Sequence, residues 1–116
     1  MNPPCQAALL RVYTEEARRD GSRPLYESVV LKARDAGLAG ATVLRGPMGF
    51  GQSAQLHTAN ILDLSANLPL VIEIVDMEDK LRGFAAALVG MTDIGLVTLE
   101  KVEVLHYGHA KPAQEG

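Results

Sequence analysis

A glycine-rich stretch near the middle of the chain has the residue types best suited to binding a ligand. Residues 40–55 read GATVLRGPMGFGQSAQ, and the apolar segment 41–44 runs directly into a loop. Glycine lets backbone N–H groups approach a ligand closely and adopt positive φ, while proline stiffens the start of the loop. A strand that leads into such a loop can hold a phosphate or another anion with main-chain donors. A mobile docking finger and a plain surface hairpin are the alternatives.

Side chains beside this loop complete a candidate anion site. Arg45 stands at its mouth and can grip an anion bidentately, and His57 can hydrogen-bond a base or a phosphate near neutral pH. The predicted effector site consists of Arg45, Gly46, Gly49, Phe50, Gly51, Gln52, Ser53 and His57. The alternatives are a solvated arginine at a strand end and an exposed loop histidine. Replacement of Gly51 by valine is expected to abolish binding where that glycine needs positive φ or close backbone approach.

Other kinds of site chemistry find little support. No Gly-Lys-Ser/Thr follows the glycines, so the stretch is not a Walker loop. His106, His109 and Cys5 match no standard zinc spacing, and we predict no metal site. No Ser-His-Asp or Cys-His arrangement stands out, so we predict no catalytic residues and no enzymatic activity. A small ferredoxin-like enzyme that uses His57 or His106 is the alternative.

Composition sets bounds on the class of protein. A chain of 116 residues corresponds to one domain, and 4% aromatic content without tryptophan predicts an aliphatic core. A formal charge of −3 argues against nucleic acid as a partner. The single cysteine, Cys5, is compatible with a reducing cytoplasm. We find neither a signal peptide nor an apolar run of roughly 18 residues, so we expect a cytoplasmic protein that does not insert into the membrane.

Periodicity predicts the elements that position the glycine loop. Period-two alternation predicts strands over residues 7–14, 41–44, 56–64, 70–75 and 96–107. Helical spacing predicts one helix from an N-cap at Ser22 to Gly37 and another from a cap at Asp76 to Gly95. Val97 and Leu99 alternate out of phase with Val102 and Val104, which predicts a bulge around Glu100 and Lys101.

This order of elements is typical of one fold class. It is the α+β, ferredoxin-like split βαβ arrangement (β-α-β-β-α-β), an antiparallel sheet with two helices on one face. We expect a single domain over residues 1–116, folded over about 7–107, with a mobile loop at about 46–67 and a disordered tail at 108–116.

The face of the sheet away from the helices should be polar where it meets water. Instead, alternation places Leu9, Tyr13, Val71 and Val75 on it, which predicts that a symmetric oligomer covers it. Sheet twist within one chain is the alternative cover. Arg11 and Glu73 lie at the centre of the same face, and we expect them to pair there because an unpaired buried charge is costly.

With these elements placed, the chain resembles the PII-like signalling proteins, and more closely a small prokaryotic family of unassigned function related to PII. The resemblance covers roughly residues 7–107. It rests on an ordered series of segments: RPLYE (23–27), GLAGATV (37–43), GFG (49–51), LP (68–69), VIEIVD (71–76), GLVTLE (95–100) and VEV (102–104). GFG is a weak signal alone, whereas the whole series is fairly specific.

The resemblance implies a homotrimer whose sheets face inward, a long T-loop at about 46–67, and small-molecule sites in the clefts between subunits. PII proteins bind adenine nucleotides in those clefts and press the T-loop on a target enzyme or transporter. Some genes of the closer family neighbour fluoride-exporting channels, so a membrane transporter is a candidate partner.

The chain departs from PII proteins where they hold phosphates. Gln52 and Ser53 stand where Arg-Gln follows GFG in PII proteins, and the arginines of the last PII strand correspond to the vicinity of Val104 and His106. The Gly-Asp-Gly-Lys of PII has no counterpart in residues 92–96. Because three phosphates need several positive groups, this leaves open a nucleotide with fewer phosphates, another anion, or no ligand.

The sequence therefore predicts a trimeric regulatory protein with no permanent cofactor. It would sense a small anionic effector, an adenine nucleotide, between its subunits and signal to a partner through the T-loop. The alternative is a structural or metal-tolerance trimer of the CutA kind that senses no nucleotide. The sequence identifies neither the effector nor the partner.

Overall fold

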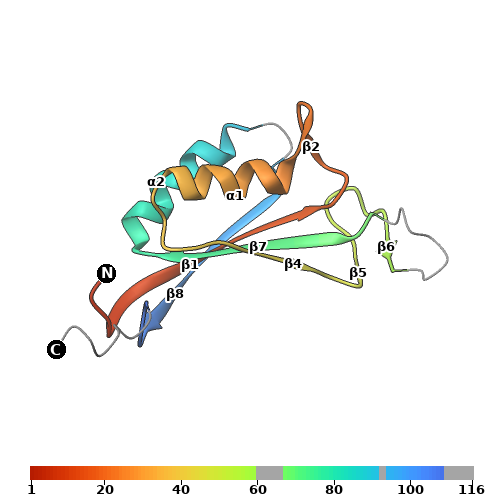
Figure 1. Ribbon diagram of the computed structural model, residues 1–116. Coiled ribbons are helices and arrows are strands. Elements are labelled where there is room, and N and C mark those ends of the chain that lie inside the picture. Colours follow the sequence, from red (N-terminus) through yellow and green to blue (C-terminus); the bar gives the residue numbers. More distant parts are fainter. Residues whose placement is uncertain (60–66, 92–93, 109–116) are drawn as a thin grey trace, which may run out of the picture.

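The computed structural model describes residues 1–59, 67–91 and 94–108, and its centre is a four-stranded sheet with two helices packed on one face (Figure 1). Predictions for the loop residues 60–66, for 92–93, for His109 and for the rest of the tail lie outside the described residues.

The elements follow one another in the predicted order, with short hairpins added. They are β1 (Cys5–Glu15), β2 (Arg19–Asp20), β3 (Arg23–Pro24), α1 (Leu25–Asp35), β4 (Thr42–Arg45), β5 (Met48–Gly49), β6 (His57–Thr58), β7 (Pro69–Asp76), α2 (Glu78–Val89) and β8 (Leu96–Val104). The main sheet has the order β4-β7-β1-β8, and each neighbouring pair is antiparallel. The predicted ferredoxin-like arrangement is confirmed.

The core lies between the sheet and the helices and is almost entirely aliphatic. Alternate residues of the two central strands, β1 and β7, point into it and are at most 1% exposed: Leu10, Val12, Ile72 and Ile74. Both helices contribute side chains with no exposed surface: Leu25, Val29, Leu81 and Leu88. Burial of such side chains contributes about 1.5–3 kcal/mol each, so this layer dominates the stability of the fold.

The helix boundaries differ from those that the sequence predicts. Helix α1 begins at Leu25 with Pro24 as N-cap, because Arg19–Asp20 and Arg23–Pro24 pair into a hairpin that places Ser22 in its turn. Asp76 does not cap α2, whose N-cap is Met77.

At its other end α2 stops at Val89, well before Gly95. Gly95 belongs instead to the turn into β8, where it has a φ of +89° and lies against the carbonyl of Tyr13. That contact, rather than termination of the helix, requires a glycine here.

The predicted bulge in the last strand is wrong. Strand β8 pairs residue for residue with β1 from Leu96 opposite Tyr13 to Val104 opposite Cys5. The apolar side chains of β8 change from one face of the sheet to the other along the strand, because the two halves of β8 have different neighbours. Val97 and Leu99 pack against the core, whereas Val102 and Val104 lie on the other face of the sheet.

The face of the sheet away from the helices, here called the open face, carries the apolar residues that alternation predicts. Tyr13 is 38% exposed, and Leu44 and Leu96 on the edge strands are 48% and 61% exposed. No helix among the described residues is long and apolar enough to cross a membrane.

An ion cluster occupies the centre of the open face. Arg11 Nε donates to Glu73 Oε2 over 2.9 Å, which confirms that the two residues pair, and Arg11 Nη1 donates to Glu100. The hydrogen bond to Glu73, followed by that to Glu100, raises the pKa of the Arg11 guanidinium above its ordinary value. The sequence does not predict the third member, Glu100, because the expected bulge obscures its place beside Arg11.

Gly95 provides a test of this fold. A Cβ at Gly95 would lie 2.3 Å from the carbonyl oxygen of Tyr13, and the φ is positive, so Gly95→Ala is expected to cost about 2–4 kcal/mol of unfolding free energy. Gly83→Ala is the matched control, because a Cβ at this site in α2 meets nothing within 4 Å. It should stabilise by about 0.5–1 kcal/mol. Urea unfolding measures both, and a Gly95→Ala protein as stable as the wild type would contradict the described turn.

Candidate functional site

The glycine loop begins as a small hairpin at the end of the sheet farthest from the N-terminus (Figure 1). Met48 pairs with Thr58 and Gly49 with His57, and Ala59 N donates to the carbonyl of Pro47 over 2.7 Å. Of the strand predicted over 56–64, the described residues form only β6. The mobility predicted for 46–67 stays a prediction.

The glycines of this loop have different roles. A Cβ on Gly46 or on Gly49 would lie 3.2 Å from the Pro69 ring, and Gly46 N donates to the Pro69 carbonyl over 2.8 Å. Both glycines therefore let the base of the hairpin lie close to β7. Gly51 is exposed, its φ is not positive, and a Cβ there would meet nothing within 4 Å. Positive φ is thus not a reason for glycine at this position.

The rest of the predicted site is divided between the hairpin end and its base. Phe50 is 73% exposed, and Gln52 and Ser53 are exposed beside it. Arg45 and His57 lie instead at the base, where each contacts a glutamate at the end of β1.

Arg45 is held by Glu16. Its Nη2 lies 2.8 Å from Glu16 Oε2, although 63% of the arginine side chain is exposed. The other carboxylate oxygen of Glu16 accepts a hydrogen bond of 3.2 Å from Leu68 N, and Glu16 N donates to Leu68 O over 3.0 Å. Glu16 therefore ties the residue before the loop to the residue that follows it.

His57 is held by Glu15 and is not an exposed loop histidine. Its Nε2 lies 2.9 Å from Glu15 Oε2, and its side chain is only 10% exposed. We call Glu15 and Glu16 together the carboxylate clasp, because they hold both arms of the loop and the hairpin. The clasp was not predicted from the sequence. The signal in the sequence was the pair of adjacent acids, Glu15 and Glu16, at the end of the first strand. That strand, β1, pairs with β7, which follows the loop, and Glu15 lies opposite Pro69.

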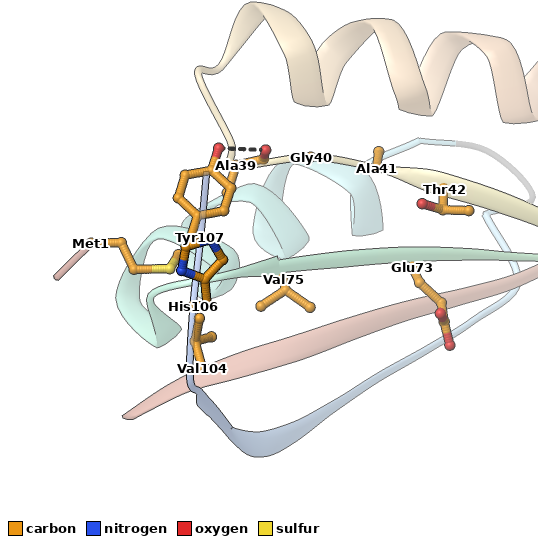
Figure 2. Close-up of a pocket in the computed structure, with 10 residues that line it drawn as sticks. All are labelled: Met1, Ala39, Gly40, Ala41, Thr42, Glu73, Val75, Val104, His106 and Tyr107. Atoms are coloured by element: carbon orange, nitrogen blue, oxygen red, sulfur yellow. Dashed lines mark hydrogen bonds between the residues drawn. The ribbon is translucent and has the colours of Figure 1, made fainter. Parts of the chain in front are cut away.

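A separate hollow of about 320 Å³ lies at the opposite end of β4, on the side of the sheet away from the helices (Figure 2). Its walls are residues 39–42, Glu73 and Val75 of β7, Val104, His106, Tyr107 and Met1. Figure 2 shows Glu73 and Val75 projecting from β7 away from the helices. The hollow brings together the GATV segment and the last strand, which sequence reasoning singled out separately.

Hydrogen bonds fix the walls of this hollow. Tyr107 Oη donates to Ala39 O over 2.8 Å and closes one end, while His106 Nε2 lies 2.9 Å from Gly108 O. On the other side Asp76, which is 4% exposed, accepts a hydrogen bond of 2.9 Å from Ala39 N. The wall at Ala39 is therefore held from two directions.

The described residues contain no group of three or more His, Cys, Asp or Glu side chains placed to hold a metal ion. The hollow instead offers the apolar side chains of Val75 and Val104, the hydroxyl of Thr42 and the carboxylate of Glu73. Such a lining suits a small organic molecule that has a flat apolar part and hydrogen-bond donors.

The fold is that of the PII-like signalling proteins. A candidate PII-like signaling protein from Thermus thermophilus superposes with a TM-score of 0.63 at 13% identity, over 86% of this chain and 90% of that one. CPII from Thiomonas intermedia K12, in a structure with ADP and bicarbonate, superposes with a TM-score of 0.59 at 18% identity, over 88% of this chain and 91% of that one.

The family described as DUF190 (Uncharacterized ACR, COG1993) matches residues 7–104, and the chain belongs to this family. A UPF0166 protein of Aquifex aeolicus (strain VF5) is 37% identical over 98 residues, which are 84% of this chain and 92% of that protein. Another relative, UPF0166 protein MJ1524 of Methanocaldococcus jannaschii, is 32% identical over 66% of this chain and 70% of its own. The resemblance found in the sequence is confirmed.

The clasp can be tested without any ligand. Glu16→Gln should weaken the contact with Arg45 by about 0.5–1 kcal/mol, the scale of a partly exposed ion pair, and speed amide exchange in residues 47–58 by about two- to fivefold. Glu27→Gln is the matched control, because Glu27 pairs with Arg23 on the exposed surface of α1, 3.7 Å apart. Hydrogen exchange followed by mass spectrometry measures both. Equal exchange in the two variants would show that the clasp does not hold the hairpin.

Proposed function

We propose that the protein is a PII-like regulatory protein, without catalysis of its own, that binds an adenine nucleotide and signals to a partner through the T-loop. The observation that carries the proposal is the hollow between residues 39–42 and the C-terminal segment, at the margin of an uncovered apolar face. CPII, which shares the fold, is a protein whose structure holds ADP.

The open face supports assembly into a trimer. It combines exposed apolar side chains, such as Leu44 and Leu96, with an arginine that already has its carboxylate partners. A neighbouring copy can cover such a face without leaving Arg11 unpaired. Because the hollow opens on the same side of the sheet, that copy would also enclose it and complete the effector site.

Strand β4 supports a route from effector to loop. Thr42, its first residue, lines the hollow, and Arg45, its last, is held by the clasp. At about 3.3 Å per residue the two Cα atoms are about 10 Å apart, but alternation places Thr42 on the open face with Glu73 and Arg45 on the other face with Leu70. Because β4 is an edge strand, the phosphate of a nucleotide whose base occupies the hollow would meet the Arg45 guanidinium around that edge. Arg45 would then exchange Glu16 for the phosphate, and the hairpin would change its attachment to the sheet.

Binding of a nucleotide by the full chain is the first test. Isothermal titration with adenosine, AMP, ADP, ATP and cyclic AMP should give a dissociation constant for at least one of them, and light scattering should give a mass near three times 12.4 kDa. Gly40→Leu should abolish binding, because Gly40 lines the hollow and a leucine there would fill it. The variant should fold, because a Cβ on Gly40 meets nothing within 4 Å.

Gly83→Leu is the control for that variant, because Gly83 lies on α2, equally free of neighbours and away from the hollow. Unaltered affinity in Gly40→Leu would place the site elsewhere. Silence of the wild type across the whole panel would favour the CutA-like alternative, for which metal titration is the next experiment. A monomer in solution would contradict both the proposed trimer and that alternative.

Substitutions of Arg45 and of its partner Glu16 should change the affinity for the nucleotide in opposite directions. Arg45→Ala should weaken nucleotide binding by about 1.5–3 kcal/mol, the scale of a lost charged hydrogen bond, while Glu16→Gln should strengthen it by freeing the arginine. The same titrations measure both variants. If neither variant changes the affinity, Arg45 belongs to the clasp alone.

A further inference from the structure

We infer, building on the proposed function, that the hollow accepts an adenine nucleotide with no more than one phosphate, and that Glu73 sets this limit. Two observations support it: the charges around the hollow, and the carboxylate partners of most arginines in the described chain.

The charge beside the hollow disfavours a polyphosphate. Glu73 is the acid in its lining, and among the described lining side chains only His106 can carry a positive charge. Glu73 shares the guanidinium of Arg11 with Glu100, so two carboxylates face one arginine at this margin of the sheet. Carboxylates outnumber the guanidinium in this cluster, and each added phosphate would increase the repulsion from them.

Most arginines that could offset this repulsion already have partners. Within 4 Å of a carboxylate lie Arg11, Arg18, Arg23, Arg34, Arg45 and Arg82. A second copy in a symmetric assembly brings the same pairs. A triphosphate would need more than one such cation, whereas one phosphate requires only that Arg45 leave Glu16.

The remaining chemistry of the hollow matches the nucleoside part of the ligand. Val75, Val104 and the Tyr107 ring offer apolar surface for a flat base, and the Glu73 carboxylate accepts hydrogen bonds. A ribose and an adenine amine provide donors for that carboxylate, while an ionised phosphate provides only acceptors. The volume of about 320 Å³ is at the lower end of the range of roughly 300–1,000 Å³ that is usual for ligand pockets.

The test compares AMP with ATP by isothermal titration of the full-length protein in magnesium-free buffer at fixed ionic strength. The wild type should bind AMP at least about tenfold more tightly than ATP, the equivalent of about 1.4 kcal/mol. Glu73→Gln should reduce this ratio to about threefold or less. Glu103→Gln, which removes the same charge from an exposed position outside the hollow, should leave the ratio unchanged.

The ratio of AMP to ATP affinity in the wild type is measured without any substitution, so it does not depend on whether Glu73→Gln folds. ATP binding as tight as AMP binding would overturn this inference and leave the proposed function standing. An equal effect of Glu73→Gln and Glu103→Gln would remove Glu73 from its role. If adenosine, AMP and ATP all fail to bind, the proposed function and this inference fall together.

Discussion

The two unlike faces of one sheet are the constraint on which the rest of the structure depends. Its helix-covered face is closed by aliphatic packing, and the other carries apolar side chains around the Arg11, Glu73 and Glu100 cluster. Exposure to water is unfavourable for the apolar side chains, and burial in a protein interior is unfavourable for an unpaired charge. A second copy of the chain would satisfy both, because it would cover the apolar residues while the arginine keeps its carboxylates. The hollow lies at the margin of this face, so in the proposed trimer assembly and ligand binding would be parts of one arrangement.

The carboxylate clasp gives the loop a defined starting position. Glu16 holds Arg45 and Leu68, and Glu15 holds His57, so under the proposed function a change at β4 would be transmitted to the hairpin. The Arg45 side chain is 63% exposed, so its contact with Glu16 is weak enough to be exchanged for a ligand contact. Under the proposed function, a chain whose arginines are mostly paired would respond to an anion by replacing one carboxylate with another anionic group.

Much of the fold could be predicted because its signals are local. Period-two alternation marks β7 clearly, and the spacing of Leu81, Phe84 and Leu88 marks the buried face of α2. The errors occur where tertiary partners decide. Asp76 binds Ala39 N and Met77 N rather than capping α2, and Gly95 serves its contact with Tyr13. The loop glycines indicate a turn, but neither the clasp nor the hollow could be predicted, since each joins residues from several segments distant in the sequence.

The most direct measurement of the central claim is a titration of the assembled, isotopically labelled protein with AMP, followed by ¹H–¹⁵N correlation spectra. The account predicts that the amides of Gly40, Ala41 and Thr42 shift with the same concentration dependence as those of Gly49 and His57 in the hairpin. Shifts that leave residues 40–42 unchanged, or that stop at β4 without reaching the hairpin, would contradict it.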